Sequence, residues 1–206
     1  LPDATRTAIR KAYARVTGKG GDLISVRSSA ADEDSASHSF AGQLSSFLYV
    51  TGVDDAARYV RSCWASCFSD RALAYRKERG LSLDGLAVAV VLQRMIDPEV
   101  SGVMFTCDPV DANPDLYVIS AVYGVGEGLV SGALEADTYW LDAGSGRLEK
   151  KTIAVKEQAF RRSESGECRA EPVSAELREK PCLGEPERGE LHRLARQVAG
   201  FYRRPQ

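Results

Sequence analysis

A single arginine follows a short apolar run in the stretch LISVRSS, which begins at Leu23. The guanidinium of Arg27 carries five N–H donors in a rigid planar fork, and this geometry matches the oxygens of a phosphate or a carboxylate. Ser28 and Ser29 follow directly and add two hydroxyl donors. The residue types and their order predict an anion-binding group at the end of a strand.

A loop of small residues comes after the arginine. The run AGQLSS at residues 41–46 contains Gly42 and Ser46, and glycine lets backbone N–H groups approach a polyphosphate closely. Together with Arg27 these residues predict a phosphate site. The alternative is that Arg27 pairs with one of the acids of the run DED at 32–34 in a surface turn, and spacing alone leaves both interpretations open.

Gln93 and Met95 follow a second apolar run, LAVAVVL at Leu86–Leu92. A strand that ends in this way can form the wall of a flat apolar slot, where the backbone reads a purine and the side-chain amide adds one hydrogen bond. A solvated glutamine at a strand end is the simpler alternative.

Two acids lie in turns farther along the chain. Asp108 precedes a proline at the end of SGVMFTCDPV, and Glu127 stands among the glycines of YGVGEGLVSG. Such a turn can close over a nucleotide or connect two strands, and taken alone the connector is preferred. A Rossmann interpretation fails because no G-x-G-x-x-G follows a parallel strand into a helix.

The hydrophobic periodicity shows which elements must position these residues. Helices are predicted at residues 1–16, 53–68, 70–79 and 190–206, with Asp70 as the N-cap of the third. Strands are predicted at residues 23–26, 46–50, 86–95, 101–109, 116–124, 137–142 and 147–155, and SESGECRAEP at 163–172 is expected to be an exposed loop. Successive strands without intervening helices favour an α+β fold with a mostly antiparallel sheet.

The composition bounds the classes of partner. The chain has 206 residues, of which 44% are hydrophobic and 27% charged, which is enough to bury a core. A net charge of -2 gives no overall basic field for nucleic acid or an anionic membrane. The longest apolar run, Leu86–Leu92, is far too short to span a bilayer. We therefore expect neither nucleic acid nor membrane as a partner.

The five cysteines are an odd number without Cys-x-x-Cys spacing, and no signal-like segment opens the sequence. They predict reduced thiols and a cytoplasmic location. Cys63 and Cys67 stand four apart on a predicted helix and could hold a metal with a histidine, but His38 and His192 are both distant in sequence. Ordinary buried thiols are the preferred interpretation, and no metal ligand is predicted within the chain.

Five motifs occur in a fixed order between Leu23 and Tyr139. They are VRSSAADED with SFAGQ, CWASCFSDRALAYR, VVLQRM, SGVMFTCDPV, and YGVGEGLVSG with DTY. In this order they resemble the nucleotide-binding domain of the phosphoenolpyruvate synthase and pyruvate phosphate dikinase family, which includes rifampin phosphotransferases. The tail ARQVAGFYRRPQ resembles the helix that precedes the last metal-binding strands of that domain.

The resemblance implies an ATP-grasp fold, in which two α+β lobes hold ATP. Residues 1–206 would form a partial domain of this type. It would comprise a helix-rich lobe with the phosphate loop at 1–85, a sheet-rich lobe at 86–160, and a loop with a C-terminal helix at 161–206.

The resemblance also implies a reaction and its residues. ATP would pass a phosphoryl group to a histidine on a separate swivelling domain, and an acceptor domain of the full-length chain would hand it to pyruvate. Arg27 would contact the ATP phosphates as the catalytic residue, Gly42 and Ser46 would lie in the phosphate loop, and Gln93 would face the adenine. Mg²⁺ is the implied metal, with its ligands expected mainly beyond Gln206.

The chain departs from that family in three respects. Residues 1–206 contain no counterpart of the family's glycine- and lysine-bearing N-terminal segment or of its last acidic strand, and neither His38 nor His192 lies in a phosphohistidine-type motif. We therefore expect a truncated piece with weak or absent ATP turnover. A rifampin phosphotransferase-like kinase and a non-catalytic nucleotide-binding or sensor module are the two alternatives.

Overall fold

This computed structural model describes residues 1–18, 22–30, 34–35, 38–39, 46–82 and 87–206. It divides into two compact units, of which the first comprises Leu1–Ile96 with Glu164–Cys168 and the second Asp97–Ser163 with Arg169–Gln206. Each unit has its own antiparallel sheet and its own helices. The prediction of an α+β fold with mostly antiparallel sheets is confirmed, and the three-part division of the chain stays a prediction.

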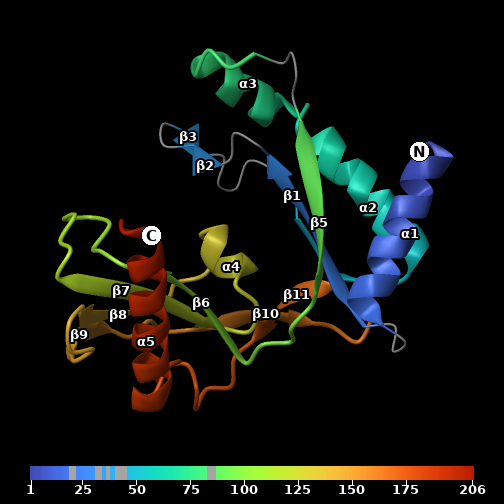
Figure 1. Cartoon of the computed structure of the whole chain (residues 1–206). Coiled ribbons are helices and arrows are strands. Elements are labelled where there is room, and N and C mark those ends of the chain that lie inside the picture. The colour runs from blue at the N-terminus through green and yellow to red at the C-terminus, as the bar shows by residue number, and fades with distance from the viewer. Residues whose placement is uncertain (19–21, 31–33, 36–37, 40–45, 83–86) are drawn as a thin grey trace. The chain divides into compact units, whose positions relative to one another are not determined.

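The first unit is built on a three-stranded antiparallel sheet in the order β4-β1-β5, with α1 and α2 packed beside it (Figure 1). The strands are β1 (Ile24–Ala30), β4 (Ser46–Val50) and β5 (Val88–Arg94). The helices are α1 (Asp3–Thr17), α2 (Val53–Ser66) and α3 (Asp70–Glu78). Two short strands, β2 (Asp34–Ser35) and β3 (His38–Ser39), pair with each other.

The core of the first unit forms where one face of the sheet meets an apolar stripe of α2. Ile24 and Val26 of β1 pack with Val60 and Cys63 of α2. Because side chains alternate along a strand, this packing turns Arg27 of β1 to the opposite face. The core therefore decides which residues of β1 face outward.

Two expectations for this unit are corrected. The N-cap of α3 is Ser69 rather than Asp70, since the Ser69 side chain accepts a hydrogen bond from the Ala72 N–H. Strand β1 extends to Ala30 rather than ending at Val26, because β5 pairs with it residue by residue from Ile24 to Ala30. The backbone pairing overrides the polar side chains that suggested an earlier end.

The second unit has a four-stranded antiparallel sheet in the order β6-β7-β8-β9. These strands are β6 (Val100–Phe105), β7 (Leu116–Tyr123), β8 (Asp137–Asp142) and β9 (Leu148–Thr152). The long helix α5 (Glu185–Tyr202) crosses one face, where Ala195 is buried against Ile119, Tyr139 and Leu141 (Figure 1). A single turn, α4 (Glu127–Val130), follows β7.

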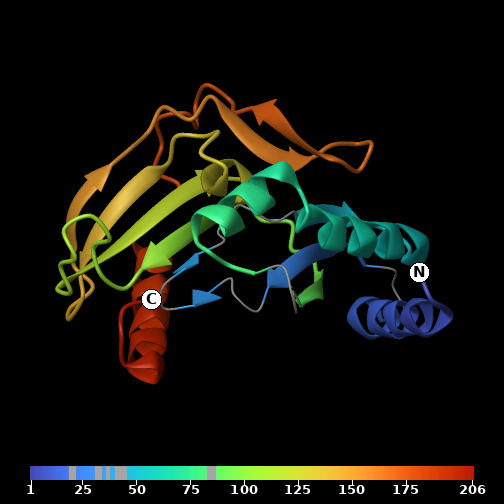
Figure 2. The same cartoon turned by 90° about the horizontal axis from the view of Figure 1, so that it is seen from above.

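The expected loop at 163–172 is wrong in part. Residues Cys168–Pro172 form β11, which pairs with β10 (Gln158–Arg162), and Figure 2 shows the two strands side by side. The charged residues favoured a loop, but a two-stranded ribbon can expose charges while burying a few positions. Ala159 is fully buried, and the Val173 N–H donates to the Glu157 carbonyl at 2.9 Å.

A buried ion pair that the sequence analysis missed joins three segments of the second unit. Lys156 Nζ donates to Asp137 Oδ1 at 2.6 Å, and both side chains are almost completely buried. The Ala154 N–H also donates to Oδ1, at 3.0 Å. The Tyr139 hydroxyl and the Cys182 N–H donate to Oδ2 at 3.1 and 2.7 Å. The carboxylate thus ties β8 to the segment after β9 and to the segment before α5.

The glycine-rich turn around Glu127 is a packing device. Gly124 has φ +73°, and a Cβ at this position would lie 2.1 Å from the Phe160 carbonyl oxygen. A Cβ on Gly128 would lie 2.5 Å from the Leu134 side chain. A side chain would clash at either position, so glycine is required there for packing. This supports the interpretation that the turn connects two strands.

We expect the Gly124→Ala substitution to lower the free energy of unfolding by at least about 2 kcal/mol, because it adds a steric clash to a left-handed backbone. Gly132→Ala is the matched control, since Gly132 has φ +72° and a Cβ added there would meet nothing within 4 Å. The control should cost only about 1 kcal/mol. Urea unfolding measures both, and equal losses would contradict the role assigned to the Phe160 contact.

The thiols of Cys63 and Cys182 are expected to react slowly in the folded chain. Burial raises the pKa of Cys63 to about 11 and that of Cys182 to about 12. At pH 9 a thiol with a pKa of 11 has about fiftyfold less thiolate than one with the ordinary value near 9. Iodoacetamide labelling followed by mass spectrometry should show at least this slowing for Cys63 relative to the urea-unfolded chain, and equal rates would contradict it.

Among the helices that the structure describes, none is both long and apolar enough to cross a lipid bilayer.

Candidate functional site

One face of the three-stranded sheet carries Arg27, Ser46, Val91 and Gln93. We call this face of the sheet the outer face. Arg27 is directly opposite Ser46 on β4 and Val91 on β5. Gln93 lies two residues beyond Val91 on β5. Directly opposed residues of antiparallel strands, and residues two apart on one strand, present their side chains to the same face.

The other face of the same sheet is the core. Val26 and Leu92, the neighbours of Arg27 and Gln93 in the chain, both pack in the hydrophobic cluster with α2. Arg27, Ser46 and Gln93 are exposed. Diagonal neighbours on adjacent strands are about 7–8 Å apart, so one ligand can contact both Arg27 and Gln93. The register therefore brings together the residues predicted for a phosphate and those predicted for a purine.

The guanidinium of Arg27 makes no ion pair with any residue that the structure describes. The acids proposed as its alternative partners are Asp32, Glu33 and Asp34. The first two, and the side chain of the third, lie outside the described residues. The exposed Arg27 guanidinium can therefore donate hydrogen bonds to an anion that binds at the outer face.

Ser28, Met95 and Gly42 were also predicted to bind the nucleotide. Ser28 is opposite Val90, a residue that packs against the core, so its side chain points away from that of Arg27. The Met95 N–H donates to the Leu23 carbonyl at 2.8 Å and is therefore not available to a purine. Gly42 lies outside the described residues.

Asp108 and Glu127 belong to the second unit. The Val110 N–H donates to Asp108 Oδ1 at 2.9 Å, and the Trp140 indole donates to Oδ2 at 3.1 Å. The hydrogen bond from Val110, and then that from Trp140, lower the pKa of Asp108. Its carboxylate thus stabilises the turn after β6. Glu127 is the exposed first residue of α4.

Neither acid takes part in a metal centre that can be recognised. Within the described ranges, no group of three or more His, Cys, Asp or Glu side chains is placed to hold a metal ion.

A cavity of about 580 Å³ lies between α5 and the sheet of the second unit. Its walls are mainly apolar and include Gly102, Met104, Ile119, Leu183 and Leu191. None of the predicted site residues lines it, so it has no part in the candidate site.

Comparison with known proteins decides the family. The family described as "Pyruvate phosphate dikinase, AMP/ATP-binding domain" matches residues 1–206, the whole chain. The chain belongs to this family. The resemblance drawn from the five ordered motifs is thereby confirmed.

Relatives of this AMP/ATP-binding domain carry different names. A "Probable phosphoenolpyruvate synthase" of Methanothermobacter thermautotrophicus is 39% identical over 100% of this chain and 30% of its own length. "Prodigiosin synthesizing transferase PigC" of Serratia marcescens is 39% identical over 98% of this chain and 22% of its own length. A "Rifampicin phosphotransferase" of a Streptomyces species is 36% identical over 100% of this chain and 23% of its own length. The chain spans less than a third of each relative.

Proposed function

We propose that this chain binds ATP at the outer face of its first unit. Arg27 and Ser46 contact the phosphates, Gln93 lies toward the adenine, and Gly42 contributes backbone donors from the phosphate loop. The observation that carries the proposal is the register of β4, β1 and β5, which sets Arg27 directly opposite Ser46 and one diagonal step from Gln93. Membership of the AMP/ATP-binding domain family supports the choice of ligand.

The proposed reaction is the transfer of a phosphoryl group from ATP to a histidine on a separate domain of a longer protein, within an ATP-grasp fold. Phosphoryl transfer depends mainly on positioning and on neutralising the charge of the phosphate oxygens. Arg27 supplies such a charge at the outer face. Met95, Asp108 and Glu127 have no step assigned to them, and Mg²⁺ with ligands elsewhere in the protein stays a prediction.

The acceptor that we propose is pyruvate: ATP, pyruvate and water would yield phosphoenolpyruvate, AMP and phosphate. The β-phosphoryl group would reach pyruvate through the histidine, and the γ-phosphoryl group would be released to water as phosphate. This choice rests on the relative named as a probable phosphoenolpyruvate synthase, which matches the whole chain. A rifamycin-type drug is the second candidate, because a relative named rifampicin phosphotransferase also matches the whole chain at 36% identity. A cytoplasmic location is proposed as well, because the cysteines are an odd number without Cys-x-x-Cys spacing.

Calorimetry with ATP on the 206-residue chain tests the binding proposal. We expect saturable binding that the Gln93→Ala substitution weakens more for ATP than for inorganic triphosphate, because the amide is placed toward the base. Leu194→Ala, on the exposed side of α5 in the second unit, is the matched control. Absence of ATP binding in the unmodified chain, with and without Mg²⁺, would overturn the proposal.

Histidine phosphorylation tests the reaction. The full-length protein is incubated with ATP labelled on the β-phosphate and, in a separate experiment, with ATP labelled on the γ-phosphate. It should form an acid-labile phosphoprotein. Pyruvate should then discharge it if the synthase assignment is right. Discharge only by a rifamycin would favour the second candidate. A protein that binds ATP without becoming labelled would favour the remaining alternative, a non-catalytic sensor module.

A further inference from the structure

Strand β4 places two apolar residues in the core at a spacing that a regular strand does not allow. Phe47 and Val50 both pack in the hydrophobic cluster of the first unit. They are three residues apart, and the alternation of a regular strand would turn them to opposite faces. The strand must therefore depart from regular geometry between them.

The departure is a β-bulge. Ile24 is opposite Val50 and Val26 is opposite Phe47, with a register shift between the two pairs. Two residues of β4, Leu48 and Tyr49, thus oppose the single residue Ser25 of β1. An extra residue of this kind reverses the face to which every following side chain points.

The bulge decides where Ser46 lies. If the pairing of Ile24 with Val50 continued without the extra residue, Arg27 would be opposite Phe47, and Ser46 would be opposite Ser28 on the core side. With the bulge, Phe47 enters the core and Ser46 is directly opposite Arg27. The outer face acquires its serine only because of this one inserted residue.

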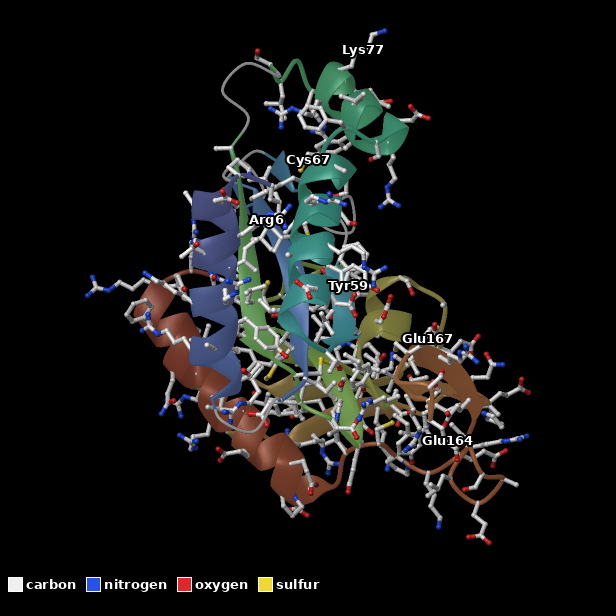
Figure 3. The ribbon with its side chains drawn as sticks, turned by 90° about the vertical axis from the view of Figure 1, so that its right-hand side faces the viewer. Arg6, Tyr59, Cys67, Lys77, Glu164 and Glu167 are labelled. Carbon is white, nitrogen blue, oxygen red and sulfur yellow. The ribbon has the colours of Figure 1, made fainter. Side chains whose placement is uncertain are left out.

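Tyr49 is the residue whose backbone makes the bulge. Its φ is +56°, in the left-handed region that glycine and asparagine tolerate and that is costly for a bulky side chain. The Tyr49 side chain is only 5% exposed, so its burial can offset the backbone cost. On the core side, Phe47 stacks on Tyr59, with ring centroids 4.4 Å apart. Figure 3 labels Tyr59 on α2.

We propose that Tyr49 is a positioning residue for nucleotide binding: its left-handed backbone maintains the bulge that sets Ser46 beside Arg27 on the outer face. Tyr49 acts through Ser46 and is not assigned a contact with the ligand. This inference rests on the proposed function for its consequence in binding, whereas the bulge and the register stand on the strand geometry alone.

A matched pair of substitutions separates backbone from side chain. Tyr49→Asn and Tyr49→Val both remove the ring, but asparagine tolerates a left-handed backbone and a β-branched valine does not. We expect the asparagine variant to bind ATP at least fivefold more tightly than the valine variant in calorimetry. Equal affinities for the two variants, with ATP binding intact in the unmodified chain, would overturn the inference.

Two further measurements test the role of Tyr49 even if the valine variant does not fold. In the asparagine variant, Ser46→Ala should weaken ATP binding by the same factor as in the unmodified chain; loss of that effect would show that the ring, and not the backbone, positions Ser46. A cross-strand nuclear Overhauser contact between residues 27 and 46 should persist in the asparagine variant, and its loss would also overturn the inference. If the unmodified chain binds no ATP while this contact persists, the proposed function fails and the assignment of the bulge stands.

Discussion

The Arg27→Ala substitution is expected to weaken ATP binding by about tenfold to a hundredfold. Hydrogen bonds to charged groups are each worth about 1.5–3 kcal/mol, and the alanine removes the whole fork of donors. The outer face retains Ser46 and Gln93, so binding is weakened rather than abolished. In the full-length protein the loss in phosphoryl transfer should be larger, of the order of a hundredfold to a thousandfold, as for a donor that stabilises transition-state charge.

Two variants make the Arg27 result specific. Arg27→Lys keeps the charge but loses the planar fork, and it should recover only part of the affinity. Arg58→Ala on α2 removes an exposed arginine of the same unit, whose partner is Asp55, and should leave calorimetric ATP binding unchanged. Equal affinity for ATP in the Arg27→Ala variant and the unmodified chain would leave Arg27 as a surface residue and remove the basis of the proposed site.

The second large effect is on stability. We expect Asp137→Ala to lower the free energy of unfolding by about 3–5 kcal/mol, because it strands the Lys156 ammonium in the protein interior without its counter-charge. The Tyr139 hydroxyl and the Cys182 N–H lose an acceptor in the same substitution. Guanidinium unfolding monitored by circular dichroism measures the change.

An exposed ion pair supplies the control for Asp137. Glu190 pairs with Arg193 on the surface of α5, where both side chains are more than half exposed. Glu190→Gln should change the free energy of unfolding by less than about 1 kcal/mol. Replacing both buried partners, as in Asp137→Asn with Lys156→Met, should destabilise less than Asp137→Ala alone. A similar loss for the buried and exposed single variants would contradict the weight given to burial.

Local patterns were sufficient for most of the fold. The run SFLYV between a small-residue loop and Gly52 predicts β4 with its observed bounds. The apolar residues of α2 recur with the 3.6-residue period of a helix, which predicts that helix. These features depend on neighbours in the chain. Strand β11 was missed because its exposed charges resemble those of a loop, and only its pairing with β10 distinguishes the two.

The residues of the candidate site were proposed from the sequence, but their arrangement in space could not be predicted from it. Arg27, Ser46 and Gln93 were singled out by chemical type and motif, whereas the face on which each lies depends on strand register. Ser28 shows the difference, since it follows Arg27 in the chain yet points to the other side of the sheet. The bulge at Tyr49 could not be predicted, because neither glycine nor asparagine stands there to indicate a left-handed backbone.

The Asp137 network escaped prediction for the same reason. Its partners Lys156 and Cys182 are 19 and 45 residues away in the chain. A DTY motif is visible in the sequence, but nothing local indicates that its carboxylate is paired with a lysine. Long-range polar partners become evident only once the strands and the start of α5 are in place.

The Asp137 carboxylate also has a consequence for local opening. One carboxylate accepts from the Ala154 and Cys182 amides and pairs with Lys156. If the segment at 154–156 separates from the sheet, the buried carboxylate loses its counter-charge, and if the segment at Cys182 separates, it loses a hydrogen-bond donor. The three stretches should therefore exchange their amide hydrogens in a single cooperative event rather than by independent fraying.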